Sequence, residues 1–313
     1  MNRREFLALG AGAVAARAFG ELKVFDLGLA DETVLKIEPI EVDLGLGKAF
    51  KALHFSDTHL NFFDVADATA VPARKPYLHQ RWVRFPQAVQ SFYATLDYAR
   101  QRGLPLLHTG DLVDCVTDGN DRFLAHNVVG LDWHYAIGNH EYHDRDPKHD
   151  GDGARQRGRL QKFFKDDLTV SSRVIGGANF VAFDNGETQV REETIRRVKA
   201  EFEKGLPVVL MCHIPPFYTP TFLNNSVATR AAILRGQGYD EKHIAGRTRP
   251  TNIWGRYDQK TRDFYTWLQT KSQLKAILCG HTHCAERDGF SETADMVVAG
   301  GNYEGRGYEI TFK

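Results

Sequence analysis

Residues 50–59 read FKALHFSDTH, a short apolar run that ends in an aspartate and a histidine. The run from Phe50 to Ser56 has the length of a buried strand. Asp57 and His59 follow it, and both are residue types that bind metals or move protons. Alone they mean little, since an aspartate after a strand usually caps a helix and a histidine there usually satisfies a local hydrogen bond. The stretch is therefore informative only if the pattern recurs.

The same pattern occurs four more times along the chain. A short apolar run is followed at once by carboxylate, amide or imidazole side chains: Leu104–Thr109 by Gly110-Asp111, Trp133–Ile137 by Gly138-Asn139-His140-Glu141, Pro207–Cys212 by His213, and Lys275–Cys279 by Gly280-His281-Thr282-His283. The carboxyl ends of strands in an α/β sheet meet at one edge, so we expect these side chains to share a crevice. His54, His108 and His134 lie within predicted strands and are expected in the core or behind the site.

Short apolar runs alternate with amphipathic stretches after residue 20, which is typical of an α/β fold. Further strands are predicted at 179–183, 296–299 and 308–311. A helix is predicted at Pro86–Arg102, because proline opens and Gly103 follows a stretch with helical apolar spacing. Other helices are predicted near 192–203 and 261–271. The four cysteines lack the spacing of a zinc site and are expected mainly as small buried hydrophobic residues.

Taken in order, the five blocks resemble the motifs of the calcineurin-like metallophosphoesterases: Asp57-x-His59, Gly110-Asp111-x-x-Asp114, Gly138-Asn139-His140-Glu141, His213 and Gly280-His281-x-His283. They span about residues 50 to 285. The resemblance implies a four-layer αββα sandwich of two mixed sheets, with helices outside and a metal site at the strand ends. His59 and Asp114 stand where the purple acid phosphatases have a glycine and a metal-binding tyrosine, so the pattern points away from that branch.

The resemblance also implies a dinuclear metal site. One divalent ion would bind Asp57, His59, Asp111 and His283, and the second would bind Asp111, Asn139, His213 and His281. Asp111 would therefore bridge the pair. This mixed oxygen and nitrogen ligand set suits Mn, Fe, Zn or Co. A hydroxide bridging the two ions would attack phosphorus in line, with no covalent enzyme intermediate.

Two residues of the third block are implied to be catalytic. His140 resembles the family's non-ligand histidine, which protonates or stabilises the leaving oxygen, and Glu141 would orient it. The alternatives for His140 are a further metal ligand or a loop-bracing residue. The implied activity is hydrolysis of a phosphate ester, with a phosphodiesterase favoured. A phosphomonoesterase or nucleotidase using the same site is one alternative, and a non-catalytic binding protein that retains the fold is another.

The distribution of charge bears on the substrate. Lys plus Arg and Asp plus Glu both number 40, so no overall field indicates nucleic-acid binding. The segment 217–256, between the fourth and fifth blocks, is predicted to be an insertion and carries six basic against two acidic side chains. We expect Arg247 and Arg249 to bind a distal anionic group of a small-molecule or lipid-headgroup phosphate ester. A solvated elaboration packed on the sandwich is the alternative.

The first 18 residues form a segment of a different kind. Arg3-Arg4, the apolar stretch 6–16 and the small residues around Arg17 resemble a signal for the twin-arginine export machinery. The apolar stretch is too short to cross a bilayer as a helix, so no stable membrane span is expected. We therefore expect a metallophosphoesterase domain at 19–313 that is periplasmic or secreted. A frayed helix with a chance arginine pair is the alternative.

Overall fold

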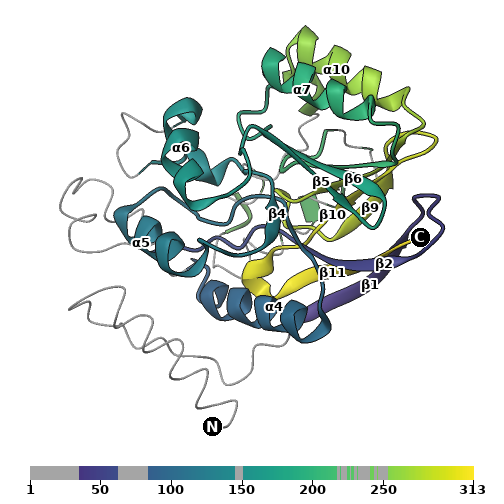
Figure 1. Ribbon diagram of the computed structural model, residues 1–313. Helices are drawn as coiled ribbons and strands as arrows, with labels where there is room; N and C mark the ends of the chain where they lie inside the picture. The colour runs from purple at the N-terminus through teal and green to yellow at the C-terminus, as the bar shows by residue number, and fades with distance from the viewer. Residues whose placement is uncertain are drawn as a thin grey trace.

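Strands from distant parts of the chain form two mixed sheets that pack face to face, with helices on both outer faces (Figure 1). The computed structural model describes residues 35–62, 84–144, 151–216 and 253–313, and a few positions between 219 and 245. The predicted signal at 1–18 and both Arg247 and Arg249 lie outside the described residues. Within those ranges, no helix combines the length and apolar character that crossing a membrane requires. The expected four-layer architecture is confirmed.

The first sheet carries three of the five blocks at the ends of neighbouring parallel strands. Its strand order is β1 (Lys36–Val42), β11 (Arg306–Phe312), β2 (Phe50–Phe55), β3 (Leu106–His108) and β4 (Trp133–Tyr135). Strands β2, β3 and β4 are parallel, whereas β11 is antiparallel to β2 and parallel to β1. The end of the chain is therefore built into the sheet beside the strand that leads to Asp57.

The second sheet carries the other two blocks. Its order is β5 (Val170–Ile175), β6 (Ala178–Phe183), β7 (Val208–Met211), β8 (Leu274–Cys279), β10 (Asp295–Val298) and β9 (Glu286–Gly289). The four central strands from β6 to β10 are parallel, and β5 and β9 pair antiparallel at the two edges. Because β7 and β8 are adjacent, the loops after them emerge side by side.

Alternating side chains divide the core into three apolar layers. On β7, Val208 and Leu210 pack with α7 (Glu192–Phe202) and α10 (Gln259–Gln269), while Val209 and Met211 pack against the first sheet. The outer face of the first sheet is covered by α4 (Ala88–Arg102), α5 (Asp118–Asn127) and α6 (Gly153–Leu160). Figure 1 shows α7 and α10 together on one side of the sandwich and α4 and α5 on the other. Both faces of each sheet are therefore buried.

The three predicted helices are present, and local chemistry explains their ends. The helix α4 stops at Arg102 because Gly103 adopts a left-handed conformation, with a φ of 62°, and donates its N–H to carbonyls of the last turn. The helix α10 begins two residues earlier than predicted, because the side chain of Asp258 accepts a hydrogen bond from the N–H of Thr261 at 2.8 Å. The capping residues in the sequence therefore predict the ends of α4 and α10 to within two residues.

Among the elements in the described ranges, three strands and two α-helices have no counterpart among the sequence predictions: β1, β5, β9, α5 and α6. The edge strand β1 contains Pro39 and buries only Val42 fully, so it lacks the apolar run that identifies a central strand. The helix α5 is short and mostly polar, although Thr117 caps it by accepting the N–H of Asn120 at 3.0 Å. These elements are stabilised mainly by tertiary packing, which a local pattern does not show.

The cysteines behave as expected of buried hydrophobic residues. All four are buried and reduced. Cys212 and Cys279 lie next to one another after β7 and at the end of β8, with their sulfur atoms 3.7 Å apart. The structure contains no disulfide between Cys279 and Cys284.

Candidate metal centre

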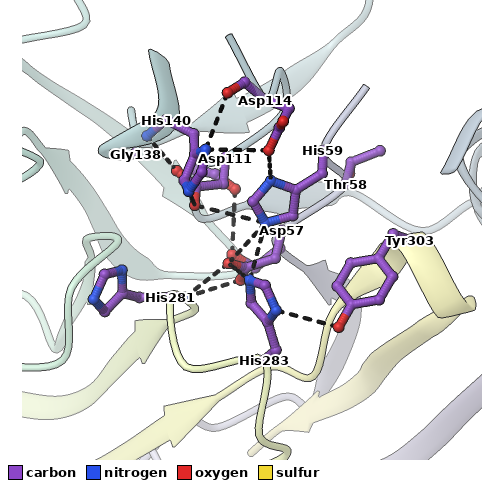
Figure 2. Close-up of polar contacts among 12 residues, drawn as sticks. Asp57, Thr58, His59, Asp111, Asp114, Gly138, His140, His281, His283 and Tyr303 are labelled. Atoms are coloured by element: carbon purple, nitrogen blue, oxygen red, sulfur yellow. Dashed lines mark hydrogen bonds and ion pairs between the residues drawn. The ribbon is translucent and has the colours of Figure 1, made fainter. Parts of the chain in front are cut away.

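The loops after β2, β3, β4, β7 and β8 converge on one cluster of carboxylate, amide and imidazole side chains (Figure 2). Asp57, His59, Asp111 and His283 each offer one ligand atom, and these atoms all lie within 4.8 Å of one another. Two blocks come from the second sheet and three from the first. The packing of the sheets is therefore what brings the five blocks together.

A second group adjoins the first and shares Asp111 with it. Asp111, His213 and His281 also place one ligand atom each within 4.8 Å. Asn139 completes this group, because its Oδ1 lies 3.1 Å from Nε2 of His213 and 2.8 Å from Nδ1 of His281. All seven residues predicted from the sequence as ligands are thus in one place, and Asp111 is common to both groups.

In two buried histidines, a hydrogen bond at Nδ1 orients the ring so that Nε2 faces the cluster. Nδ1 of His59 lies 2.8 Å from Oδ1 of Asp114, and Nδ1 of His213 lies 2.7 Å from the carbonyl oxygen of Thr109. Both partners are acceptors, so each Nδ1 carries a proton, and Nε2 is the ring nitrogen that faces the cluster. Anchoring of this kind is usual for metal-binding histidines.

The backbone is unusual at the same positions. Asp57, His59, Asp111, His281 and His283 all have positive φ angles, of 54°, 52°, 54°, 73° and 60°. Non-glycine residues avoid this left-handed region, and clusters of such residues occur at functional sites. Gly280 adds a close approach, because a Cβ atom there would lie 2.3 Å from Oδ2 of Asp57. The loops are therefore shaped to hold particular side chains.

The charges of the cluster fit divalent cations. Asp57 and Asp111 are both buried, and among the described residues no lysine or arginine forms an ion pair with either. Burial alone would raise the pKa of each carboxyl, but neighbouring histidines, chiefly His283 for Asp57 and His213 for Asp111, lower it. Burial likewise opposes a charge on His213, yet Asp111 and Asp57 raise the pKa of His213 to about 10. The cluster thus attracts positive charge, and its oxygen and imidazole donors suit transition metals.

His140 lies beside the cluster, at its more exposed side. Its Nδ1 is 3.0 Å from the carbonyl oxygen and 3.1 Å from Oδ1 of Asp114, and its Nε2 is 4.0 Å from Oδ2 of Asp111. The side chain of His140 is 19% exposed, whereas that of Asp111 is only 1% exposed. The ring is therefore anchored on one side and faces both the cluster and solvent on the other.

The structure corrects the role expected of Glu141. Its carboxylate accepts the backbone N–H groups of Asp111, Val113 and Gly138, at 3.0, 3.1 and 2.8 Å. Asp114, not Glu141, makes the orienting contact with His140. The reason is the 3₁₀ turn η2 (His140–Tyr142), in which adjacent side chains diverge, so that Glu141 is buried while His140 faces the site. Glu141 braces the loops that carry Asp111 and Asn139.

The inserted segment makes contact near the same edge. Two of its described residues bind β9: Asn225 donates to Oε2 of Glu286 at 2.8 Å, and Thr219 donates to Asp288. The strand β9 begins three residues after His283. The ring of Phe85 stacks on the imidazole of His59 with centroids 4.5 Å apart. Residues outside the five blocks therefore also border the cluster.

Comparison with known proteins assigns the fold and cluster to a class. The model of the calcineurin-like phosphoesterase family matches residues 50–285, and the chain belongs to this family. The protein is therefore a metal-dependent phosphoric ester hydrolase, and the cluster of His and Asp residues is able to bind metal ions. No curated protein matches the chain significantly.

Several solved structures are similar at low identity. A dimetal phosphatase from Danio rerio shares 11% identity over 82% of this chain and 88% of that chain, with a TM-score of 0.45. A 5'-nucleotidase from Candida albicans shares 12% identity over 87% of this chain and 47% of that chain, with a TM-score of 0.40. A phosphopantetheinyl hydrolase from Mycobacterium tuberculosis shares 12% identity over 86% of this chain and 92% of that chain, with a TM-score of 0.35.

We predict that Asp111→Asn lowers bound metal and abolishes hydrolysis while the protein stays folded and soluble. An amide oxygen carries no net charge and cannot hold two cations as a carboxylate does. Elemental analysis, an activity assay and circular dichroism measure the three properties. Asp144→Asn is the matched control, because Asp144 is also a buried carboxylate but lies outside the two groups and accepts a hydrogen bond from Gln156. Full metal content with a near-normal rate in Asp111→Asn would reject the shared-ligand assignment.

Proposed function

We propose that the protein is an exported phosphodiesterase that uses a dinuclear centre to hydrolyse a phosphate diester. In this proposal, one ion binds Asp57, His59, Asp111 and His283, and the other binds Asp111, Asn139, His213 and His281. The observation that carries the proposal is the convergence of these seven side chains around Asp111, with His140 beside them. Two divalent cations supply Lewis acidity toward phosphate oxygens and toward water when they are bound.

The formal charge of the centre favours a diester. Two divalent ions and two ionised aspartates sum to about two positive charges, and a hydroxide lowers this to about one. A diester carries a single negative charge and matches this value, whereas a monoester dianion would leave an excess that enzymes usually neutralise with arginine. This charge balance supports the diester.

His140 is the residue that we assign to the leaving group. Asp114 holds Nδ1, so Nε2 is left to face the substrate side of the centre. From there it can donate a proton to the departing oxygen, or stabilise the negative charge that develops on it. The remaining exposure of the ring is consistent with a group that meets substrate. Arg247 and Arg249 remain our candidates for binding the distal part of the substrate.

A comparison of two aryl phosphates tests the choice of substrate class. We expect kcat/KM to be higher for bis(4-nitrophenyl) phosphate than for 4-nitrophenyl phosphate when the protein is loaded with Mn²⁺. A panel of cyclic nucleotides, nucleotide diphosphate sugars, lipid-headgroup esters and mononucleotides then narrows the class. Preference for monoesters would identify a phosphomonoesterase or nucleotidase instead. Full metal loading without turnover of any compound would favour the non-catalytic binding protein.

We predict that His140→Ala lowers turnover by roughly two to four orders of magnitude while metal stoichiometry is retained. The loss should be smaller for a 4-nitrophenyl ester than for an alkyl ester, because nitrophenolate leaves without protonation. Steady-state rates for both esters and metal analysis provide the measurement. His126→Ala, at an exposed position of α5, is the control. Equal losses with both leaving groups would count against the role as an acid.

Export is the remaining part of the proposal, and residues 1–18 carry it. Replacing both arginines of the pair, Arg3→Lys with Arg4→Lys, keeps the charge but removes the twin-arginine pattern. We expect this variant to remain in the cytoplasm, whereas the control Arg17→Lys reaches the periplasm. Cell fractionation with immunodetection measures the distribution. Unchanged export of the double variant would contradict this route.

A further inference from the structure

One predicted ligand, His283, is held differently from the two histidines already described. The side chains of His59 and His213 are fully buried, whereas that of His283 is 17% exposed. Its Nε2 lies 3.2 Å from Oδ1 of Asp57 and 2.9 Å from Nε2 of His59, so it faces the first group of ligands. Its outer nitrogen, Nδ1, lies 3.2 Å from the hydroxyl oxygen of Tyr303 (Figure 2). The hydroxyl of Tyr303 is thus the partner of Nδ1 in His283. In His59 and His213 the partner of Nδ1 is the Asp114 carboxylate or the Thr109 carbonyl.

Tyr303 is fixed by the end of the chain that leads into β11. It belongs to the 3₁₀ turn η5 (Asn302–Glu304), and its backbone N–H donates to the carbonyl oxygen of Asp57 at 3.2 Å. The preceding residue, Asn302, is fully buried; its N–H donates to Ser56 at 2.8 Å and its side chain donates to Thr95 at 2.9 Å. The turn is therefore tied directly to the backbone that carries Asp57.

The ring of Tyr303 is also enclosed by the site. It is 6% exposed, its centroid is 4.6 Å from that of Phe85, and it is 5.8 Å from the ring of His59. A buried tyrosine hydroxyl normally requires a hydrogen-bond partner, and here that partner is His283. Tyr303 lies beyond residue 285, where the match to the family model ends. Its contact with the centre is therefore a feature of this chain outside the five blocks.

We propose that Tyr303 is a positioning residue of the metal centre. Its hydroxyl oxygen accepts the Nδ1–H of His283, which keeps the lone pair of Nε2 directed toward the ion shared with Asp57, His59 and Asp111. This inference rests on the dinuclear centre of the proposed function, but not on the choice of substrate. Because His283 belongs to only one of the two ligand groups, Tyr303 affects one ion more than the other.

The variant Tyr303→Phe tests the proposal, since it removes the hydroxyl group and keeps the ring. Tyr308→Phe is the matched control, because Tyr308 is equally buried and its ring stacks near His54, which is not a predicted ligand. Full-length protein stripped with a chelator is titrated with Co²⁺ and followed by visible absorption. We expect Tyr303→Phe to weaken one of two binding steps by about ten- to a hundredfold. The control should bind both ions as the wild type does.

Two outcomes of this titration would overturn the proposal. One is binding of both ions by Tyr303→Phe with wild-type affinity. The other is an equal loss in both steps together with a drop in the melting temperature of the metal-free protein, which would make the hydroxyl merely structural. If the wild type itself bound no Co²⁺, the metal centre would be rejected and this inference with it.

A measurement on the wild type does not depend on how the variants fold. In the Zn²⁺-loaded protein, nitrogen-15 NMR should show His283 protonated at Nδ1, with a downfield, slowly exchanging proton that marks a hydrogen bond. Loss of this signal in Tyr303→Phe, with the other ring protons unchanged, is the expected signature. Protonation of His283 at Nε2 in the loaded wild type would overturn the proposal.

Discussion

Two aspartates, Asp57 and Asp111, are buried within a few ångströms of one another at the ends of adjacent strands. Like charges in a low-dielectric interior repel strongly, and a buried carboxylate without a partner is costly. The described residues supply histidines around this pair, and no lysine or arginine is bonded to it. Bound divalent ions would add the positive charge that this arrangement favours, and the surrounding loops hold the side chains that could bind them.

Metal binding also requires that the groups behind the ligands are held rigidly. Glu141 ties together three backbone amides of two loops, and Asp114 contacts both His59 and His140. Asn185, which follows β6, does the same for the loop after β7, because its side-chain oxygen accepts the N–H groups of His213 and Ile214. Side chains buried behind the site thus fix the backbone before any ion arrives, which limits the reorganisation that binding requires.

The convergence of the seven predicted ligands could be expected from the sequence, because each follows a short apolar run and strand ends meet at one edge of a sheet. The roles of Glu141 and Asp114 could not, since they depend on how a single 3₁₀ turn directs adjacent side chains. Tyr303 was also missed, although the sequence contains a hint: Gly300-Gly301-Asn302 follows a predicted strand and signals a tight turn. The contacts of Tyr303 depend on the pairing of β11 with β2, which joins residues far apart in the chain.

The left-handed backbone at five of the seven predicted ligands has a consequence for how such proteins diverge. Each of these residues carries a conformational cost of order 1 kcal/mol that a glycine, which has no Cβ atom, would relieve. A descendant released from catalysis would therefore lose this strain as it exchanged its ligands for glycine. Loss of activity in this family need leave no trace in the fold, and glycines at these positions would be the record of it.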